Sequence, residues 1–250
     1  MTTVDTPAAA PAPAEPKPNS FARIFGVLFS PEATFASIAR RPTWVAPFLV
    51  LVVMALVSGL VLASRLDFAA PVREQMESRK DIPPEQVDRA VRIATAMGKV
   101  IPLTAPLFMV IGLLIVAGIL LLAFRLFGGE GTFGQAWAAV NYASMPSVIK
   151  TIIILIVVLA KGGAALNPAL LPTLVRSNPA FLFDPKTQAM AYAFTANFDV
   201  FSIWVLVLMI IAFAHLARVS KAKSAAIVIS LWLVKCVVTL IGPAMQSLRK

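Results

Sequence analysis

The sequence predicts an all-α integral membrane protein, a bundle of five transmembrane helices preceded by amphipathic interfacial helices at the N-terminus. Two observations carry this prediction. First, 59% of the 250 residues are hydrophobic and 14% are charged, against roughly 45–50% and 25% in soluble domains. Second, several apolar runs reach the roughly 20 residues that a helix needs to cross the hydrocarbon of a bilayer. Together they exclude an ordinary soluble enzyme.

Residues 1–19 form an N-terminal tail rich in alanine and proline. Low hydrophobicity and frequent proline predict disorder for this tail. The tail lacks the apolar stretch of a cleavable signal peptide, so we expect the first membrane span to serve as the insertion signal.

Residues 20–41 are expected to form two short amphipathic helices that lie in the headgroup layer. Apolar side chains recur every three or four residues along the first helix and therefore share one face: Phe21, Ile24, Phe25, Leu28 and Phe29. A second helix begins at Ser30-Pro31-Glu32, where a cap, a proline and an acid follow one another. A buried soluble helix is the less favoured interpretation, because no soluble core exists for it to join.

Residues 42–248 are predicted to form the membrane domain. Its five spans are apolar runs at about 42–64, 100–124, 136–160, 200–217 and 224–247. The connection 65–99 holds six of the twelve acids and contains an amphipathic helix. That helix either packs on the end of the bundle or continues into the second span. The connection 161–197 is apolar and proline-rich, and is expected to form an interfacial or partly re-entrant cap.

The segment from Gly128 to Pro146 is unusually polar and small for a membrane protein. After a glycine-rich turn, small side chains recur every fourth residue on one helical face, at Ala139, Ala143 and Ser147. Small residues let two membrane helices approach closely, and Pro146 interrupts the backbone hydrogen bonds. The favoured interpretation is a helix-packing seam with a kink. The alternative is a binding or conformational hinge site inside the membrane, with Asn141 and Ser144 as its polar groups.

Ionisable residues inside the spans are costly, by roughly 2.5 kcal/mol or more at the bilayer centre, and are therefore candidate functional residues. Lys150 lies in the third span and Lys235 near the middle of the fifth. Asp199, at the head of the fourth span, is a candidate counter-charge, although it lies nearly half a helix length from the level of Lys235. Together with Asn141 and Ser144, these residues form the predicted intramembrane polar site. The alternative is snorkelling, in which the lysine stem carries the amine to the headgroups.

The sequence offers no convincing catalytic, cofactor or metal site. His215 is the only histidine and Cys236 the only cysteine, so neither a metal cluster nor a Ser/His/Asp arrangement can be assembled. The net charge of +10 comes from cations that flank the apolar runs, which suits membrane lipids with anionic headgroups better than nucleic acid. We therefore expect no enzyme activity, no cofactor, no metal and no nucleic-acid partner.

The expected location is the cell (inner) membrane, with the N-terminus in the cytoplasm. The short loop from Arg218 to Lys223 has three cations and no acid, which is typical of a cytoplasmic loop. The complete Lys/Arg count opposes this orientation, with eight on the N-terminal side and twelve on the other. Seven of those twelve, however, lie beside six acids in residues 65–99.

Several short motifs follow one another along the chain: Ser-Pro-Glu-Ala-Thr-Phe from Ser30, Pro-Thr-Trp-Val-Ala-Pro from Pro42, the glycine turn with Thr132-Phe133, Asn-Tyr-Ala-Ser-Met-Pro from Asn141, Phe-Asp-Val-Phe-Ser-Ile-Trp from Phe198 and Ser-Lys-Ala-Lys-Ser-Ala from Ser220. In order and spacing they resemble the prokaryotic branch of the Ypt/Rab-interacting protein (Yip) family, over about residues 21–245. The resemblance implies five membrane helices with a cytosolic N-terminus. Eukaryotic relatives act in vesicle traffic and contact prenylated small GTPases. The Asp-Leu-Tyr-Gly-Pro element of those relatives is absent here, so the resemblance does not extend that partner to this chain.

The function that the sequence favours is a non-enzymatic membrane adaptor or organising protein. Such a protein binds another membrane protein, associates with itself, or shapes lipid packing. The alternative is a small transporter or channel whose polar path uses Lys150, Lys235 and Asn141. A lipid-modifying enzyme is a weaker third class, because it would need a catalytic constellation that the sequence does not contain.

Overall fold

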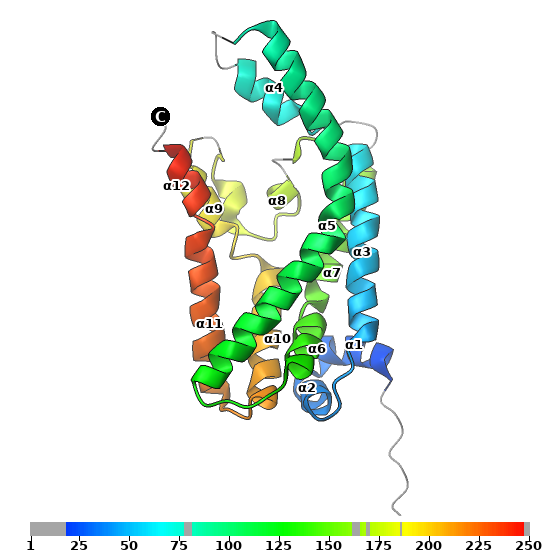
Figure 1. The fold of residues 1–250 in the computed structure, drawn as a ribbon, viewed down its shortest axis with the longest axis vertical. Coiled ribbons are helices and arrows are strands. Elements are labelled where there is room, and N and C mark those ends of the chain that lie inside the picture. Colours follow the sequence, from blue (N-terminus) through cyan, green and yellow to red (C-terminus); the bar gives the residue numbers. More distant parts are fainter. Residues whose placement is uncertain (1–18, 78–81, 162–165, 169–170, 186, 248–250) are drawn as a thin grey trace, which may run out of the picture.

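The computed structural model describes residues 19–77, 82–161, 166–168, 171–185 and 187–247, which form a bundle of helices (Figure 1). Residues 1–18 of the N-terminal tail, for which the sequence predicts disorder, lie outside the described residues. Within the described residues the structure has no β-strand and one isolated bridge, between Leu66 and Leu166. The predicted all-α class is confirmed.

Two short helices precede the bundle, α1 (Ser20–Phe29) and α2 (Pro31–Arg40). The Asn19 side chain caps α1 by accepting hydrogen bonds from the first backbone N–H groups. Pro31 begins α2, where its missing N–H would have no helical partner in any case. Both helices therefore start where local sequence signals place them.

Four helical segments are long and apolar enough to cross a membrane. They are α3 (Val45–Arg65), the second half of α5 (Pro84–Leu126), the pair α6 (Phe133–Ala143) and α7 (Met145–Ala160), and α11 (Lys221–Val238) with α12 (Ile241–Ser247). The predicted fourth span corresponds to α10 (Val200–Leu216). This helix qualifies together with α9 (Ala189–Thr195), across a bend of 46°. The chain is thus a multi-pass membrane protein with four spans, or five if the bent pair counts as one.

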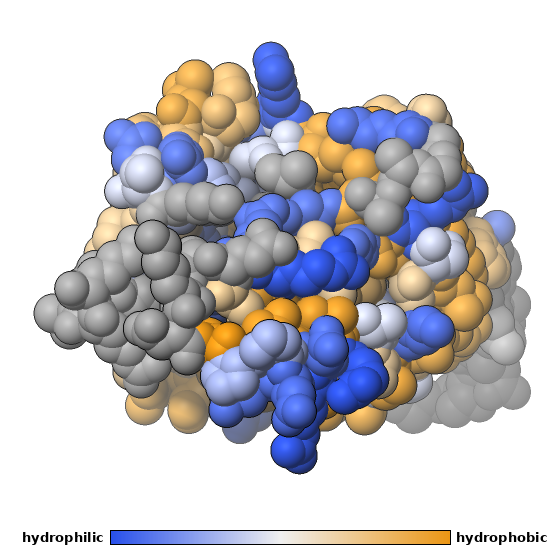
Figure 2. All heavy atoms as spheres, turned by 90° about the horizontal axis from the view of Figure 1, so that it is seen from above, coloured by the Kyte–Doolittle hydropathy of each residue, from blue (hydrophilic) through white to orange (hydrophobic). Residues whose placement is uncertain are grey.

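The bundle has two distinct ends, which we call the α1–α2 end and the cap end (Figure 1). The turns from α5 to α6 and from α10 to α11 lie at the α1–α2 end. The cap end carries α4 (Ala70–Glu77), α8 (Leu171–Leu174), the 3-10 helix η2 (Pro179–Leu182), α9 and α12. In the view onto the cap end, Figure 2 shows polar residues over the middle and hydrophobic residues around the flanks. This distribution suits a protein whose flanks face lipid.

Helix α5 runs for 43 residues and includes Pro102 and Pro106 within its length. The amphipathic helix predicted in the first connection therefore continues directly into the second span, which is one of the two arrangements that the sequence left open. Helix α3 packs along α5. A side chain at Gly59 would place its Cβ 2.2 Å from the backbone oxygen of Pro102, so glycine at this position permits the close approach of the two helices.

Helix α6 lies at the centre of the bundle and every residue from Ala136 to Ala143 is buried. A capping box between Thr132 and Gln135 starts the helix directly after the glycine turn. The Gln135 side chain also donates a 2.7 Å hydrogen bond to the Ala39 carbonyl at the end of α2. Helices α2, α3, α5 and α10 pack around α6, and its many small residues allow this dense packing.

The two N-terminal helices use their apolar residues differently. In α2, Phe35 and Ile38 are buried in the hydrophobic core, and the helix packs against α10 and α6. In α1, Val27 is also buried in the core, and Ile24 and Leu28 pack against it. Phe21, Phe25 and Phe29, by contrast, are 61%, 66% and 80% exposed. The sequence pattern predicts that both helices lie in the headgroup layer as amphipathic helices. In α2 the apolar residues pack on protein, because α10 ends and α6 begins beside this helix.

Candidate functional site

The head of α10 is organised by Asp199, whose side chain is completely buried. Its Oδ1 atom accepts hydrogen bonds from the backbone N–H groups of Phe201, at 3.0 Å, and Ser202, at 3.3 Å. This is the N-cap arrangement that satisfies the first free donors of a helix. Asp199 therefore fixes the start of α10 immediately after the bend from α9.

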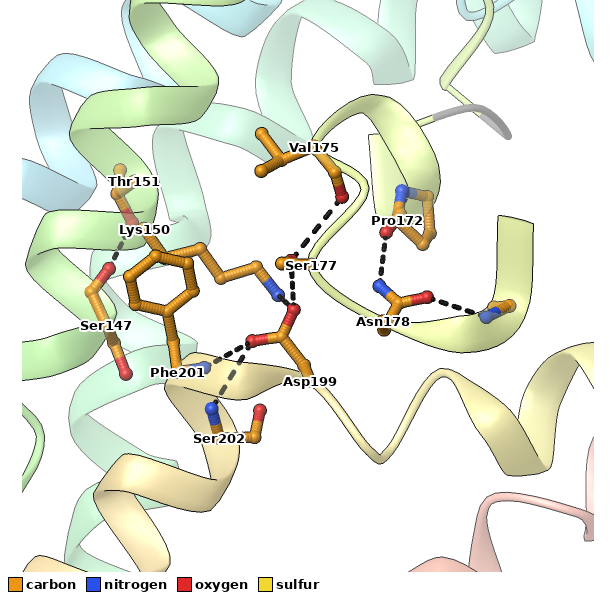
Figure 3. Close-up of polar contacts among 11 residues, drawn as sticks. Ser147, Lys150, Thr151, Pro172, Val175, Ser177, Asn178, Asp199, Phe201 and Ser202 are labelled. Atoms are coloured by element: carbon orange, nitrogen blue, oxygen red, sulfur yellow. Dashed lines mark hydrogen bonds and ion pairs between the residues drawn. The ribbon is translucent and has the colours of Figure 1, made fainter. Parts of the chain in front are cut away.

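The second carboxylate oxygen of Asp199 binds a lysine from another span (Figure 3). Lys150 Nζ, from α7, lies 3.0 Å from Asp199 Oδ2, and the two side chains are 28% and 1% exposed. The hydroxyl of Ser177 donates to the same carboxylate oxygen. Asp199 thus joins α7, α10 and the segment between η2 and α8 in one polar cluster.

The segment that carries Ser177 is held in place by its own hydrogen bonds. The Asn178 side chain donates to the Pro172 carbonyl at 2.9 Å and accepts from the Ala180 N–H at 3.0 Å (Figure 3). The Val200 N–H donates to the Ser177 carbonyl at 3.0 Å. The connection predicted as a cap therefore folds over the head of α10.

Lys235 has a different partner from Lys150. Its Nζ donates a 2.9 Å hydrogen bond to Oδ1 of Asn197, two residues before Asp199. The Asn197 side chain in turn donates to Thr239 Oγ1 at 3.1 Å and to the Ala193 carbonyl at 2.9 Å. The two intramembrane lysines thus contact neighbouring residues at the α9–α10 bend, while the counter-charge Asp199 pairs with Lys150.

Asn141 and Ser144 lie apart from this cluster, inside the buried helix α6 and at its end. Each donates to a carbonyl one turn earlier in its own helix, at Trp137 and Val140 respectively, both at 2.8 Å. The Oδ1 atom of Asn141 is buried, and within the described part of the chain it has no hydrogen-bond partner. Nine residues separate Asn141 from Lys150, which corresponds to roughly 13 Å of helix rise. The structure therefore does not unite the five predicted polar residues in one site.

The four residues predicted as a packing seam or hinge also lie in different surroundings. Ala139 and Ala143 are buried in the core. The helix is interrupted at Ser144, and Pro146 occupies the first turn of α7. Ser147, one turn beyond Ala143, is exposed and lines a cavity. The small residues are thus covered by neighbouring helices along α6, whereas at the beginning of α7 they face the cavity.

The cavity has a volume of about 530 Å³ and lies between α5, α7, α10 and α11. Its lining is largely apolar, with three polar residues, Ser147, Ser202 and Lys235. The volume falls in the roughly 300–1,000 Å³ range of small-molecule sites. Its chemistry suits an apolar or amphiphilic molecule, because Lys235 is the only charged group among the described residues that line it.

Among the described residues, no group of three or more His, Cys, Asp or Glu side chains is placed to hold a metal ion. Asp199 is a carboxylate beside a hydroxyl, but the N-cap contacts and Lys150 occupy both of its oxygens. These contacts suit an anchoring role better than proton transfer. The polar cluster can hold helices together, and the cavity can bind a molecule.

At the α1–α2 end a second polar cluster surrounds Arg23, whose side chain is nearly buried. Its guanidinium donates to the carbonyl of Arg41, to the hydroxyl of Thr43 and to both the carbonyl and the hydroxyl of Ser37, at 2.7–3.3 Å. The Tyr142 hydroxyl, from α6, lies 3.2 Å from Thr43 Oγ1 and donates to the Ser20 carbonyl at 3.2 Å. Helix α1 is therefore fixed to the bundle by polar contacts.

Helix α2 is fixed to the other side of the bundle through Glu32. Its carboxylate lies 2.6 Å from Lys221 Nζ and 2.9 Å from His215 Nε2. The contact with Lys221, followed by that with His215, holds the pKa of the Glu32 carboxyl below its ordinary value. His215 therefore belongs to an ion-pair cluster that links α2 to the end of α10 and the beginning of α11.

Sequence reasoning missed Ser177, Asn197 and Arg23. Ser177 and Asn197 lie in a proline-rich connection whose path over α10 depends on tertiary packing. Arg23 adjoins the apolar residues of α1 in the sequence, and arginine in such a position usually faces the headgroups. The sequence does contain an indication that Asn197 takes part in polar contacts. It lies two residues before Asp199, and two polar residues close together at the head of a span can contact polar groups at the same depth.

Comparison with known proteins identifies the family. The model of the Yip1 domain family matches residues 25–242, which is most of the chain. Searches of curated proteins and of solved structures found no match. The match confirms the resemblance drawn from the short motifs, and the protein is a multi-span membrane protein that belongs to the Yip1 domain family.

Proposed function

We propose that the protein is a non-enzymatic membrane-organising protein that shapes lipid packing through α1. The observation that carries this proposal is the row of three exposed phenylalanines on that helix, Phe21, Phe25 and Phe29. They recur every fourth residue and therefore lie along one face. Exposed aromatic side chains on a helix at the end of a membrane bundle are expected to enter the boundary between headgroups and acyl chains.

The attachment of α1 to the bundle supports this role. The Arg23 cluster and the hydrogen bond from Tyr142 to the Ser20 carbonyl hold the helix along its first half. Along its second half, α1 approaches α2 closely, since a Cβ at Gly26 would lie 2.6 Å from Thr34 Oγ1. Because α1 cannot rotate away, its phenylalanine side chains occupy a fixed depth relative to the spans.

A row of side chains inserted into one leaflet expands that leaflet relative to the other. The protein would therefore prefer curved or loosely packed membranes, as amphipathic interfacial helices do. In the orientation that the cation-rich loop 218–223 favours, this leaflet is the cytoplasmic leaflet of the cell (inner) membrane. Membrane lipids are then the first partner of α1.

The decisive experiment measures how the reconstituted protein distributes between flat and curved membrane. Full-length protein is placed in giant vesicles, a thin tube is pulled, and the protein density on the tube is compared with that on the vesicle. Wild-type protein is expected to be enriched on the tube. The triple variant Phe21→Ala, Phe25→Ala, Phe29→Ala is expected to lose this enrichment.

The matched control is Phe108→Ala, because Phe108 is as exposed as Phe25, at 66%, but lies on the spanning helix α5. The control variant should distribute like wild type. Equal enrichment of the triple variant and wild type would refute the proposal.

In the adaptor form of this function, the exposed phenylalanine face of α1 binds another membrane protein instead of lipid. A photo-cross-linking amino acid at position 25 separates the two forms in native membranes. Adducts to lipid are expected if α1 acts on lipid packing. A near-stoichiometric adduct to a single protein, or to a second copy of this chain, would instead establish the adaptor form and name the partner.

A small transporter is the second candidate, and the observation in its favour is the cavity with Lys235 in its wall. A transported solute would depend on this charge, because the rest of the cavity wall is largely apolar. The variant Lys235→Leu would then abolish flux across reconstituted vesicles while the protein still folds. Under the membrane-organising proposal, flux of small solutes is the same in wild type and in this variant.

A further inference from the structure

We propose that the cavity between α5, α7, α10 and α11 binds an anionic phospholipid from the leaflet at the cap end. Lys235 would bind the headgroup phosphate, and an acyl chain would fill the apolar part of the cavity. This site is independent of α1 and of the function proposed above. It rests on the shape of the cavity, on the depth of its polar residues and on the charge of Lys235.

The polar and apolar parts of the cavity lie at different depths. Its three polar lining residues, Ser147, Ser202 and Lys235, each lie fourteen residues from the α1–α2 end of their own span. At 1.5 Å per residue this places them about 21 Å from that end. Met209 and Val228 lie seven residues from the same end, or about 10 Å. The three polar residues therefore lie about 10 Å nearer the cap end than Met209 and Val228. A lipid of the cap-end leaflet has its headgroup on the same side of its acyl chains.

Lys235 carries a positive charge that no acid balances in the described part of the chain. Its one polar contact there is the neutral Asn197 side chain. An ammonium group can donate three hydrogen bonds, so two donors remain for a ligand. Lysine is a common ligand of phosphate groups. The unbalanced charge at the polar end of the cavity selects a ligand with a net negative headgroup.

Lys150, by contrast, is an intramembrane lysine whose charge is neutralised by an acid. Its amine pairs with the buried carboxylate of Asp199, which leaves no net charge on the pair. Lys150 is also not among the residues that line the cavity. The two lysines therefore have separate roles, one in joining helices and the other in binding.

The position of the opening favours a lipid as the occupant. Val116 and Ile119 of α5 and Val234 and Val238 of α11 line the cavity and are all exposed. The cavity thus opens sideways between two helices whose outer faces are apolar. In a bilayer this opening faces acyl chains, so a lipid can enter without leaving the membrane.

The test is native mass spectrometry of the full-length protein in detergent micelles. The protein is titrated with phosphatidylglycerol or phosphatidylcholine of identical acyl chains, which differ in the net charge of the headgroup. Wild-type protein is expected to bind one phosphatidylglycerol more tightly than phosphatidylcholine. The variant Lys235→Leu should lose about tenfold in phosphatidylglycerol affinity, which corresponds to about 1.4 kcal/mol. Lys235→Arg should keep the preference.

Two further variants separate charge from cavity shape. Lys223→Leu removes a lysine from the opposite end of the same helix and should leave both affinities unchanged. Ser147→Leu fills the cavity without changing the charge and should weaken the binding of both lipids. The proposal is overturned if Lys235→Leu binds phosphatidylglycerol like wild type, if wild type does not distinguish the two lipids, or if Ser147→Leu has no effect. A protein cross-linked through position 234 in native membranes would also overturn it.

Discussion

The Lys150 amine and the Asp199 carboxylate lie 3.0 Å apart and join α7 to the head of α10. Because Asp199 also caps α10 and binds Ser177, one buried side chain connects three segments that are distant in the chain. On the other side of the same bend, Lys235 binds Asn197. The bend of 46° between α9 and α10 is therefore held from two neighbouring spans.

Removal of the lysine from this pair should be strongly destabilising. In Lys150→Met, Asp199 would remain buried without a counter-charge. We expect the free energy of unfolding to fall by about 3 kcal/mol, the lower end for breaking a buried pair, because the Lys150 side chain is 28% exposed. Thermal or chemical unfolding in detergent measures this loss.

The double variant Lys150→Met, Asp199→Asn provides the internal control. Asparagine still caps a helix and no longer leaves a buried charge, so most of the lost stability should return. Lys223→Met, at an exposed position, should unfold like wild type. If Lys150→Met alone also unfolds like wild type, the pair contributes nothing to the joining of α7 and α10.

Replacement by leucine should have different effects at two positions on the face of small residues. Ala143→Leu should cost about 1–3 kcal/mol, because Ala143 is completely buried and a larger side chain would overpack the core. Ser147→Leu, one turn later on the same face, should change stability little because its side chain enters the cavity. Melting temperatures of the two variants in one detergent test this contrast, and equal losses would contradict it.

The contact of α2 with the turn after α10 should depend on pH through Glu32. The contacts with Lys221 and His215 lower the pKa of this carboxyl. A carboxyl whose pKa is lowered by folding adds stability above its unfolded pKa, and this stability is lost as the pH falls through the folded value. The contribution is modest, because Glu32 and Lys221 are both substantially exposed.

The measurement is the difference in melting temperature between wild type and Glu32→Gln from pH 7 to pH 3. Wild type should melt higher at pH 7, and the difference should shrink as the pH falls below the ordinary glutamate value of about 4.3. Glu130→Gln removes a more exposed pair, with Arg218, and should show no comparable difference. A wild-type advantage that grows toward low pH would contradict the sign of this linkage.

Arg23 should not be replaceable by lysine. Its guanidinium donates four hydrogen bonds in a fixed geometry, and a lysine amine lacks both the planar shape and the number of donors. We expect Arg23→Lys to lower the free energy of unfolding by about 1–3 kcal/mol. Faster proteolysis after position 41, at the start of the link to α3, would report the release of α1. Arg40→Lys is the control, and a stable, protease-resistant Arg23→Lys would refute this role.

The long apolar helices of the structure coincide with apolar runs of the sequence, because the length of such a run is set by the thickness of the bilayer. The starts of α1, α2 and α10 also follow from local chemistry, since Asn19, Pro31 and Asp199 stand where helices begin. The interruption near Pro146 is likewise visible in the sequence. These features need only information from neighbouring residues.

The pairing of polar groups could not be obtained in this way. Asp199 pairs with Lys150 rather than Lys235 because α7 packs beside the head of α10 and because Ser177 folds over it. Arg23 is buried because Thr43 and Ser37 converge on it from the following segment. Such contacts join residues from separate elements, so they depend on how helices pack and not on the pattern within one helix.

The depth of α1 in the bilayer decides whether this helix acts on lipid packing. A nitroxide label is attached at position 25 of the full-length protein in lipid vesicles, and its collisions with oxygen and with a water-soluble nickel chelate are measured. The native Cys236 is buried, which limits its labelling, and a label at position 130, in the turn after α5, serves as the reference in water. If α1 enters the bilayer, the label at position 25 collides with oxygen and is shielded from nickel. If the label at position 25 is as accessible to nickel as the one at position 130, α1 lies in water and does not act on lipid packing.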